Sequence, residues 1–280
     1  MYTVGLVELG GTELGYVSAS GNSWKLVQLA ARGRIPEHAF SNPKIGAIAI
    51  IGQSPEKAPL AEKALLRKKH VLVDFPPAQT VDWARKLEAI AAEKGVCIYS
   101  PNLMKTETGF QELKRLMDNS TSKMLSVTMT CRVDAKLRSL GFSMKLAQLL
   151  DVIEWVAGSR IKEIYGETSA KRSHSAALVA LASFDTGLRV LLNMYSAPFR
   201  STRLWVDVVF KDSVVHVEPY AQSIRVTPFQ EKSMREVNWA TSSLTATIED
   251  FMAHISSEKQ VLDLENLERM FGLARAVTVD

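Results

Sequence analysis

The chain has 280 residues, of which 46% are hydrophobic and 23% charged, and its formal net charge is +4. This length suits two domains of ordinary size or one large one, and the composition is that of a globular chain able to bury a core. The mild positive balance suits an anionic ligand such as a dinucleotide, and no basic stripe interleaved with aromatics supports a nucleic-acid-binding surface.

The same composition argues against a membrane partner and a metal site. No apolar run approaches the roughly 18 residues of a spanning helix, and the N-terminus lacks the basic region of a signal peptide, so we expect a cytoplasmic protein. Cys97 and Cys131 both fall in predicted strands and are interpreted as small buried hydrophobes. The five histidines show no zinc-ligand spacing, so no metal site is predicted.

The first predicted element is a strand at Thr3–Leu9, followed by a glycine-rich turn. A Rossmann unit has G-x-G-x-x-G at this point, where the N-terminus of a helix holds a pyrophosphate. This chain offers G-x-T-x-x-G, and the following residues are poor helix formers, so Leu14–Ala19 is predicted as a strand and the phosphate-binding helix as missing or shortened. The candidate pyrophosphate contacts are Gly10, Gly11 and Thr12; the alternative is a turn between two strands.

A helix is predicted at Ser23–Ala31, with Asn22 or Ser23 as its N-cap, and Gly33–Asn42 is predicted as a connection. Helices and strands then alternate through Lys44–Asn102. This alternation predicts βαβ units, a parallel sheet and right-handed crossovers. The predicted elements are the strands Ile45–Ile51, His70–Asp74 and Val96–Tyr99, and the helices Glu56–Lys69, Val81–Lys94 and Thr106–Asp118.

Ligands of parallel sheets bind outside the carboxyl ends of the strands. The residues at those ends that we predict to contact a cofactor are Gln53, Ser54, Asp74, Phe75, Pro76 and Asn102. Four of these choices have a structural alternative: helix capping for Gln53 and Ser54, a core aromatic for Phe75, and an Asx turn for Asn102. A cis peptide bond before Pro76 is compatible with its low cost, ~0.5–1 kcal/mol.

The pattern changes from Met124 onward, where strands follow one another around a single apolar helix at Met144–Ala157 that Gly158 ends. Turn signals between these strands predict a largely antiparallel sheet with a helix packed on it. The predicted strands are Met124–Arg132, Ile161–Ala170, Ala176–Phe184, Leu188–Ser196, Leu204–Phe210, Val214–Val217 and Ser223–Pro228, and the terminal helices are Thr245–Ser256 and Glu265–Val277.

The predicted fold class is α/β plus α+β. Residues 1–121 form a Rossmann-like parallel-sheet domain with a trimmed first half. Residues 122–280 form a mostly antiparallel, open-sheet α+β domain with helices on one face, and the last helices are expected to pack back on the first domain.

Three stretches of this sequence resemble the Gfo/Idh/MocA family of nicotinamide-dependent oxidoreductases. They are AIAIIGQSPEKAPLAEKAL, then KKHVLVDFP, which is close to the family's GKHVLVEKP, and EKGVCIYSPNLMKTETGFQELKRLM. The second domain is similar too, with Trp155 and Gly158 ending a helix and FDTG at Phe184–Gly187. The biliverdin-reductase branch looks nearest, because its E-Y-P resembles Asp74-Phe75-Pro76 and its G-F-P resembles Gly141-Phe142-Ser143. The resemblance implies NAD or NADP as cofactor, a small-molecule ligand, and a homodimer through the C-terminal sheet.

The resemblance also implies catalytic positions, and this chain departs from them. The family's E-K-P lysine, which meets the substrate and the nicotinamide ribose, is replaced by Phe75. When Asp151 is aligned with the acid that ends the family's helical D-x-x-x-H motif, Met144 and Gln148 occupy its proton-transferring positions. None of these three replacements is a general acid or base near neutral pH, so no catalytic residue is predicted.

The predicted function is an NAD(P)-dependent oxidoreductase that lacks the usual lysine and Asp/His pair. A conjugated, bilin-like or unsaturated substrate fits these absences, because the cofactor provides the hydride while solvent or an arginine provides the proton. The alternative is a catalytically inactive family member that acts as a binding or assembly protein.

Overall fold

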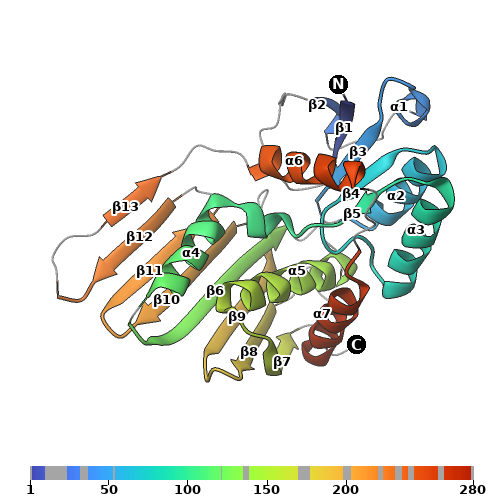
Figure 1. Ribbon diagram of the computed structural model, residues 1–280. Helices are drawn as coiled ribbons and strands as arrows, with labels where there is room; N and C mark the ends of the chain where they lie inside the picture. The colour runs from blue at the N-terminus through green and yellow to red at the C-terminus, as the bar shows by residue number, and fades with distance from the viewer. Residues whose placement is uncertain are drawn as a thin grey trace. The chain divides into compact units, whose positions relative to one another are not determined.

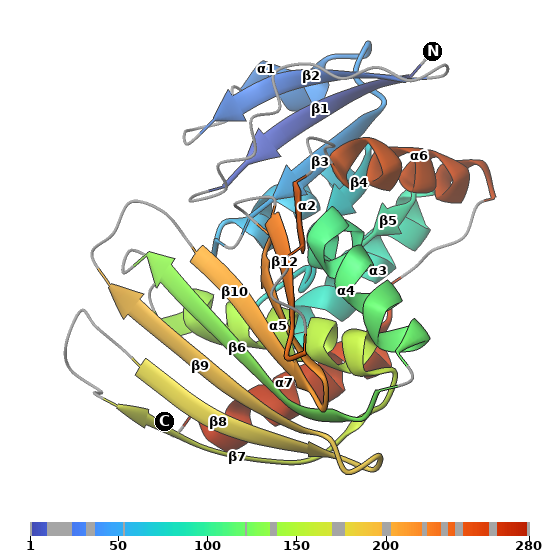
Figure 2. The ribbon, with the colours of Figure 1, turned by 90° about the vertical axis from the view of Figure 1, so that its left-hand side faces the viewer.

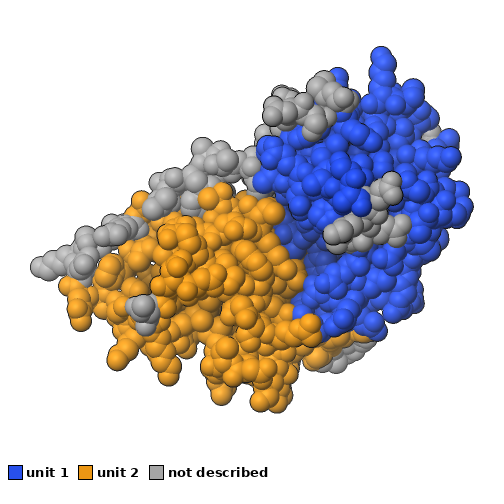
Figure 3. Space-filling view, viewed as in Figure 1, with its two compact units in different colours: residues 1–103, 139–145, 244–271 blue, residues 104–138, 146–243, 272–280 orange. Residues whose placement is uncertain are grey.

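The protein is described here from a computed structural model, shown in Figure 1. The structure describes residues 2–9, 24–31, 37–52, 54–120, 122–134, 139–169, 177–197, 203–219, 223–230, 235–238, 243–257 and 262–278. The chain forms two compact units, coloured separately in Figure 3. Unit 1 comprises residues 1–103, 139–145 and 244–271, and unit 2 comprises residues 104–138, 146–243 and 272–280.

Unit 1 is built on a five-stranded parallel sheet in the order β2-β1-β3-β4-β5. The strands are β1 (Tyr2–Glu8), β2 (Trp24–Ala31), β3 (Ala47–Ile51), β4 (His70–Val73) and β5 (Ile98–Tyr99). The helices are α1 (Glu37–Ser41), α2 (Lys57–Leu66), α3 (Val81–Lys94) and α6 (Ser243–Ser256), with the first part of α7 (Leu264–Val277). The predicted βαβ units and parallel sheet are confirmed.

Helices cover both faces of this sheet (Figure 1). On one face, α2 and α3 pack with buried alanines and leucines, including Ala61, Leu65 and Leu87. On the other face, Ile248 and Phe251 of α6 complete a core with side chains of β1 to β4. Burial on both faces explains why Ala47–Ile51 reads as a continuous apolar run instead of an alternating one.

Local signals fix the ends of α3 at the predicted residues. The hydroxyl of Thr80 accepts a hydrogen bond from the backbone N–H of Trp83 at 3.3 Å, which is an N-cap. Gly95 ends the helix in a left-handed conformation with φ 64°.

The predicted helix at Ser23–Ala31 is wrong, because Trp24–Ala31 is a strand. It pairs in parallel with β1, and Trp24 and Leu26 are buried while Lys25 and Val27 are exposed. This alternation has the period of a strand, and the pairing with β1 overrides the helix propensity of the sequence. The connection predicted at Gly33–Asn42 contains the short helix α1.

Unit 2 is built on an eight-stranded sheet in the order β13-β12-β11-β10-β6-β9-β8-β7. The pair β6 and β9 is parallel and the other pairs are antiparallel. The strands are β6 (Met124–Asp134), β7 (Ile161–Ser169), β8 (Ala177–Phe184), β9 (Arg189–Ala197), β10 (Arg203–Phe210), β11 (Ser213–Glu218), β12 (Ser223–Pro228) and β13 (Arg235–Asn238). The sequence did not predict β13; the other strands and the fold class are confirmed.

Helices lie on one face of this larger sheet. They are α4 (Thr108–Asn119), α5 (Ser139–Ala157) and the end of α7, and the 3-10 turn η1 (Leu103–Thr106) precedes α4. The Val277 carbonyl of α7 accepts a hydrogen bond from the Thr168 hydroxyl of β7 at 2.8 Å. Among the residues that the structure describes, no helix covers the opposite face of the strands (Figure 2).

The described helices include none that is long and apolar enough to cross a membrane. Cys97 and Cys131 are buried free thiols, as interpreted from the sequence.

Candidate functional site

The candidate site is the edge of the five-stranded sheet where the carboxyl ends of β1, β3, β4 and β5 lie together. The strand order reverses between β1 and β3, and this is the position where open parallel sheets bind ligands. The backbone N–H of Leu9 donates to the carbonyl of Ile51 at 2.7 Å. Gly52 follows with φ 107°, and a Cβ placed there would lie 2.0 Å from the Leu9 carbonyl oxygen. Only glycine permits this close approach of the two strand ends.

Asp74 connects the neighbouring strand ends. Its carboxylate accepts hydrogen bonds from the backbone N–H groups of Gly52 and Leu103, and its own N–H donates to the Ile50 carbonyl at 3.1 Å. The next residue, Phe75, donates from its N–H to the Pro101 carbonyl at 3.0 Å, and the bond from Phe75 to Pro76 is cis. Asp74 and Phe75 therefore hold the ends of β3, β4 and β5 together.

Two buried lysines flank Asp74, and neither was predicted from the sequence as a site residue. Lys57, in the first turn of α2, is fully buried, and its Nζ donates to the backbone carbonyl of Asp74 at 2.8 Å. Lys145, in α5, is 5% exposed and adds a second positive charge beside the same two groups. We call Lys57, Asp74 and Lys145 the lysine–aspartate cluster.

Burial controls the ionisation of this cluster. It lowers the pKa of Lys57 to about 8, against the opposing attraction of Asp74, and the charge of Lys145 lowers it further. Burial also raises the pKa of Asp74, although both lysines and the two backbone N–H groups favour its ionised form. Strongly perturbed groups at a strand end are typical of functional sites.

Sequence signals for both lysines were present. Lys57 lies one and two helical turns before Ala61 and Leu65, so it shares the apolar face of α2. Lys145 belongs to a helix that is apolar on every side, where any polar residue is expected to be buried.

The predicted contact residues lie at this edge in part. Asp74, Phe75 and Asn102 expose only 4%, 5% and 6% of their surface. The hydroxyl of Ser54 accepts from the N–H of Glu56 at 3.2 Å, but the N-cap residue of α2 is Glu56, whose side chain makes no capping hydrogen bond, so Ser54 does not cap this helix. Gly10, Gly11, Thr12 and Gln53 lie outside the described residues, as does the strand predicted at Leu14–Ala19.

Ser100, at the end of β5, is a further residue that the sequence analysis did not select. Its hydroxyl oxygen is buried, and among the residues that the structure describes it has no hydrogen-bond partner. A buried hydroxyl in this state is an available donor and acceptor for a ligand at the strand ends.

The remaining candidate positions are in α5. Met144 and Gln148 are buried. Asp151 is also buried, and its two oxygens lie 2.9 and 2.8 Å from the Nζ of Lys105, so its carboxylate is paired with a lysine. Within the described residues, no group of three or more His, Cys, Asp and Glu side chains has the arrangement of a metal site.

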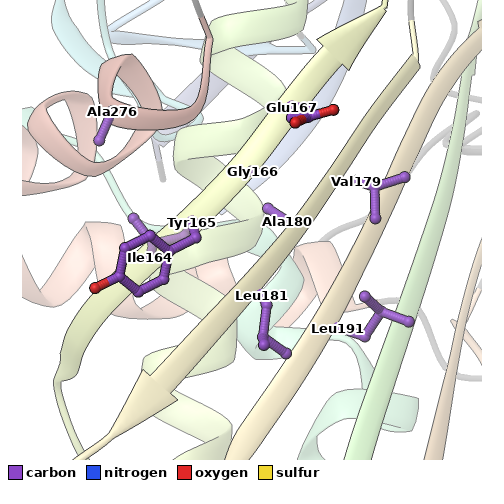
Figure 4. Close-up of a pocket in the computed structure, with 9 residues that line it drawn as sticks. All are labelled: Ile164, Tyr165, Gly166, Glu167, Val179, Ala180, Leu181, Leu191 and Ala276. Atoms are coloured by element: carbon purple, nitrogen blue, oxygen red, sulfur yellow. The ribbon is translucent and has the colours of Figure 1, made fainter.

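A hollow of about 500 Å³ lies in unit 2, on β7 and its neighbouring strands (Figure 4). Its lining is mostly apolar, and Glu167 is the one charged residue in it. It offers no set of hydrogen-bond donors for a dinucleotide, so it is a separate feature from the strand-end site.

Comparison with known proteins identifies the N-terminal region. The family model described as the oxidoreductase family Gfo/Idh/MocA, NAD-binding Rossmann fold, matches residues 16–103. An uncharacterized oxidoreductase of Escherichia coli (strain K12), YdgJ, is 32% identical over 112 residues, which are 38% of this chain. The match spans only 32% of that relative's length.

Solved structures share the fold along nearly the whole chain. An aldose-aldose oxidoreductase from Caulobacter crescentus has a TM-score of 0.72 at 15% identity, with 98% of this chain and 97% of that chain covered. UDP-N-acetylglucosamine 3-dehydrogenase GnnA from Acidithiobacillus ferrooxidans has a TM-score of 0.67 at 17% identity, with 98% and 96% covered. At these identities the likeness establishes the fold alone. Residues 16–103 therefore match the NAD-binding region of the Gfo/Idh/MocA oxidoreductase family, and the chain as a whole shares the fold of these solved structures.

Proposed function

We propose that this protein binds NAD or NADP at the carboxyl ends of β1, β3, β4 and β5 and transfers a hydride to a small-molecule substrate. The main support is the reversal of strand order between β1 and β3, since open parallel sheets bind ligands at this point. Leu9 and Gly52 approach each other so closely there that a side chain at position 52 is excluded. The match of residues 16–103 to an NAD-binding Rossmann fold supports the same edge.

One observation at this edge supports a dinucleotide as the ligand. The buried hydroxyl of Ser100 has no hydrogen-bond partner among the described residues, and a ribose or carboxamide group satisfies such a hydroxyl. Ser54 and Asn102 remain proposed contacts at the neighbouring strand ends. When bound, the cofactor supplies the hydride, and the chain supplies binding, orientation and charge.

The substrate class that suits these residues is a conjugated, unsaturated acceptor, such as a bilin-like compound. Oxidation of an alcohol needs a general base, and Phe75, Met144 and Gln148 provide none. In a conjugated acceptor, the hydride adds to one carbon of the double bond and the electron pair moves to the conjugated oxygen. Water then supplies the proton, so the reaction needs no general acid at these three positions.

Cofactor binding tests this proposal directly. Titration of the purified protein with NADH and with NADPH, followed by fluorescence and by thermal shift, is expected to give a saturable signal with at least one of them. The bound protein is then expected to oxidise the cofactor in the presence of a conjugated acceptor and not to reduce NAD or NADP in the presence of sugars. Reduction of NAD or NADP by a sugar would overturn the substrate class.

A second candidate is an inactive binding or assembly protein with the same fold. The low exposure of Asp74, Phe75 and Asn102, 4–6%, favours it, because these predicted contacts are already engaged inside the protein. Absence of any response at millimolar NADH and NADPH would support this candidate over the oxidoreductase.

We also infer a homodimer through the open face of the eight-stranded sheet. Tyr165 and Val179, which are 66% and 55% exposed, and Leu181, which is 37% exposed, lie on adjacent strands of that face (Figure 4). The same face carries exposed residues of both signs, such as Glu167 and Arg189. A second copy related by a two-fold axis can match apolar patch to apolar patch and oppose unlike charges.

A further inference from the structure

The lysine–aspartate cluster lies immediately before position 75, where the family resemblance leads one to expect an amine and this chain has Phe75. Lys57 approaches from α2 instead, with its Nζ 2.8 Å from the backbone carbonyl of Asp74. Lys145 approaches from α5. Both lysines are buried, so the chain keeps cationic groups at this strand end although the residue at position 75 has none.

A lysine at position 57 is costly to bury, and its contacts with the backbone carbonyl and the charge of Asp74 offset part of that cost. Burial of an ammonium group is costly unless its hydrogen bonds are satisfied, and an apolar side chain would suit this face of α2 better. Lys69 provides the comparison within the same chain. It is also buried, at the opposite end of β4, and its Nζ donates to the carbonyls of Asn42 and Ile45 at 2.9 and 2.8 Å. Both lysines donate to backbone carbonyls, but Lys69 lies far from the ligand edge and Lys57 lies at it.

We propose that Lys57, supported by Lys145, makes the strand-end site bind the reduced nicotinamide cofactor more tightly than the oxidised one. The reduced ring is uncharged and the oxidised ring carries a positive charge, so a fixed cation near it opposes only the oxidised form. A unit charge about 10 Å away in a partly buried site changes the ratio of the two affinities by on the order of tenfold. A site with this preference favours reduction of the substrate. This inference rests on the proposed function, because it requires a nicotinamide at these strand ends.

The preference for the reduced cofactor should depend on pH, because the charge of Lys57 in the lysine–aspartate cluster depends on pH. Among the described residues, the charged groups that act on Lys57 are Asp74, at the end of β4, and Lys145, from α5. The pKa of Lys57 is lowered to about 8, so its positive charge is present at pH 7 and is lost as the pH rises past 8. The preference for the reduced cofactor is therefore expected to weaken between pH 7 and pH 9.5.

The experiment measures dissociation constants for NADH, NAD, NADPH and NADP with the wild-type protein and three variants. Lys57→Met removes the charge at position 57, and Lys57→Arg retains it. Lys69→Met removes a buried lysine at the opposite end of β4 from Asp74. The ratio of oxidised to reduced dissociation constants is expected to fall on the order of tenfold in Lys57→Met. It should stay at the wild-type value in Lys57→Arg and Lys69→Met.

The outcomes separate this inference from the proposed function. If the wild-type protein binds neither form of either cofactor, the proposed function fails and the inference fails with it. If it binds both, but the ratio is the same in Lys57→Met and constant from pH 7 to 9.5, the inference alone is overturned. Should Lys57→Met not fold, the pH series on the wild-type protein decides, because it needs no substitution.

Discussion

Lys68 has a left-handed backbone conformation, with φ 56°, in the turn between α2 and β4. The turn is closed by hydrogen bonds from the N–H of Lys68 to the Leu65 carbonyl at 2.8 Å and from the N–H of Lys69 to the Ala64 carbonyl at 3.1 Å. A residue with a Cβ pays about 1–2 kcal/mol in this conformation, and glycine, the residue in the family's GKHVLVEKP, avoids that cost.

Lys68→Gly is therefore expected to raise the free energy of unfolding by ~0.5–1 kcal/mol, after the greater entropy of glycine in the unfolded chain is subtracted. Urea denaturation of the two proteins measures the difference. Lys68→Ala is the control, since it keeps the Cβ and should bring no gain. A Lys68→Gly protein no more stable than the wild type would contradict this account of the turn.

At the same scale, the sequence located part of the site. The placement of Asp74, Phe75 and Asn102 at neighbouring strand ends follows from the βαβ pattern, and the structure has them at one edge. The burial of Phe75 agrees with the core-aromatic alternative, whereas the burial of Asp74 and Asn102 did not follow from the pattern, because it depends on side chains from other elements. The apolar face of α2 indicates that Lys57 is buried, but the partner of its amine, Asp74, becomes known only when the strands are in place.

At the scale of elements, α6 completes the core on one face of the parallel sheet with buried side chains such as Ile248 and Phe251. Phe251 is fully buried there, and its ring lies parallel to that of Tyr99, with centroids 6.3 Å apart. The Tyr99 hydroxyl donates to Asp250, and the ring of His254 stacks on the ring of Tyr99 with centroids 4.3 Å apart. This helix is therefore fastened to β5 by both apolar and polar contacts.

Phe251→Ala is expected to lower the free energy of unfolding by ~3–5 kcal/mol, because it opens a cavity in a core that cannot fully collapse. Glu249→Ala, on the exposed side of the same helix, should change it by less than about 0.5 kcal/mol. Thermal and urea unfolding of both variants provide the measurement. Equal effects of the two substitutions would mean that α6 does not anchor this core.

Elements were predictable where local signals and tertiary contacts agree. The helix at Val81–Lys94 has an apolar stripe, an N-cap at Thr80 and a C-terminal Gly95, and its predicted bounds are those of α3. Trp24–Ala31 has helix formers that a neighbouring strand overrides. Arg235–Asn238 is short and polar, and only pairing with β12 makes it a strand.

For the whole molecule, the open sheet face determines the expected assembly. Val179→Lys introduces a charge into the centre of the proposed interface, and it is expected to convert a dimer into monomers in size-exclusion chromatography with light scattering at micromolar concentration. Val27→Lys is the matched control, because Val27 is a 41% exposed valine on a strand of the other sheet. A wild-type protein that is monomeric at these concentrations would rule out the proposed interface.

The position of α6 in the chain has a consequence for how the protein forms. The core of unit 1 joins Val4 and Leu6 in the first strand to Ile248 and Phe251 in a helix near the C-terminus. On the ribosome, β1 to β5 emerge long before α6 has been synthesised. One apolar face of the sheet, with its alanines, leucines and isoleucines, therefore stays uncovered through most of translation. During that time aggregation competes with folding, and the exposed face is a binding surface for a chaperone.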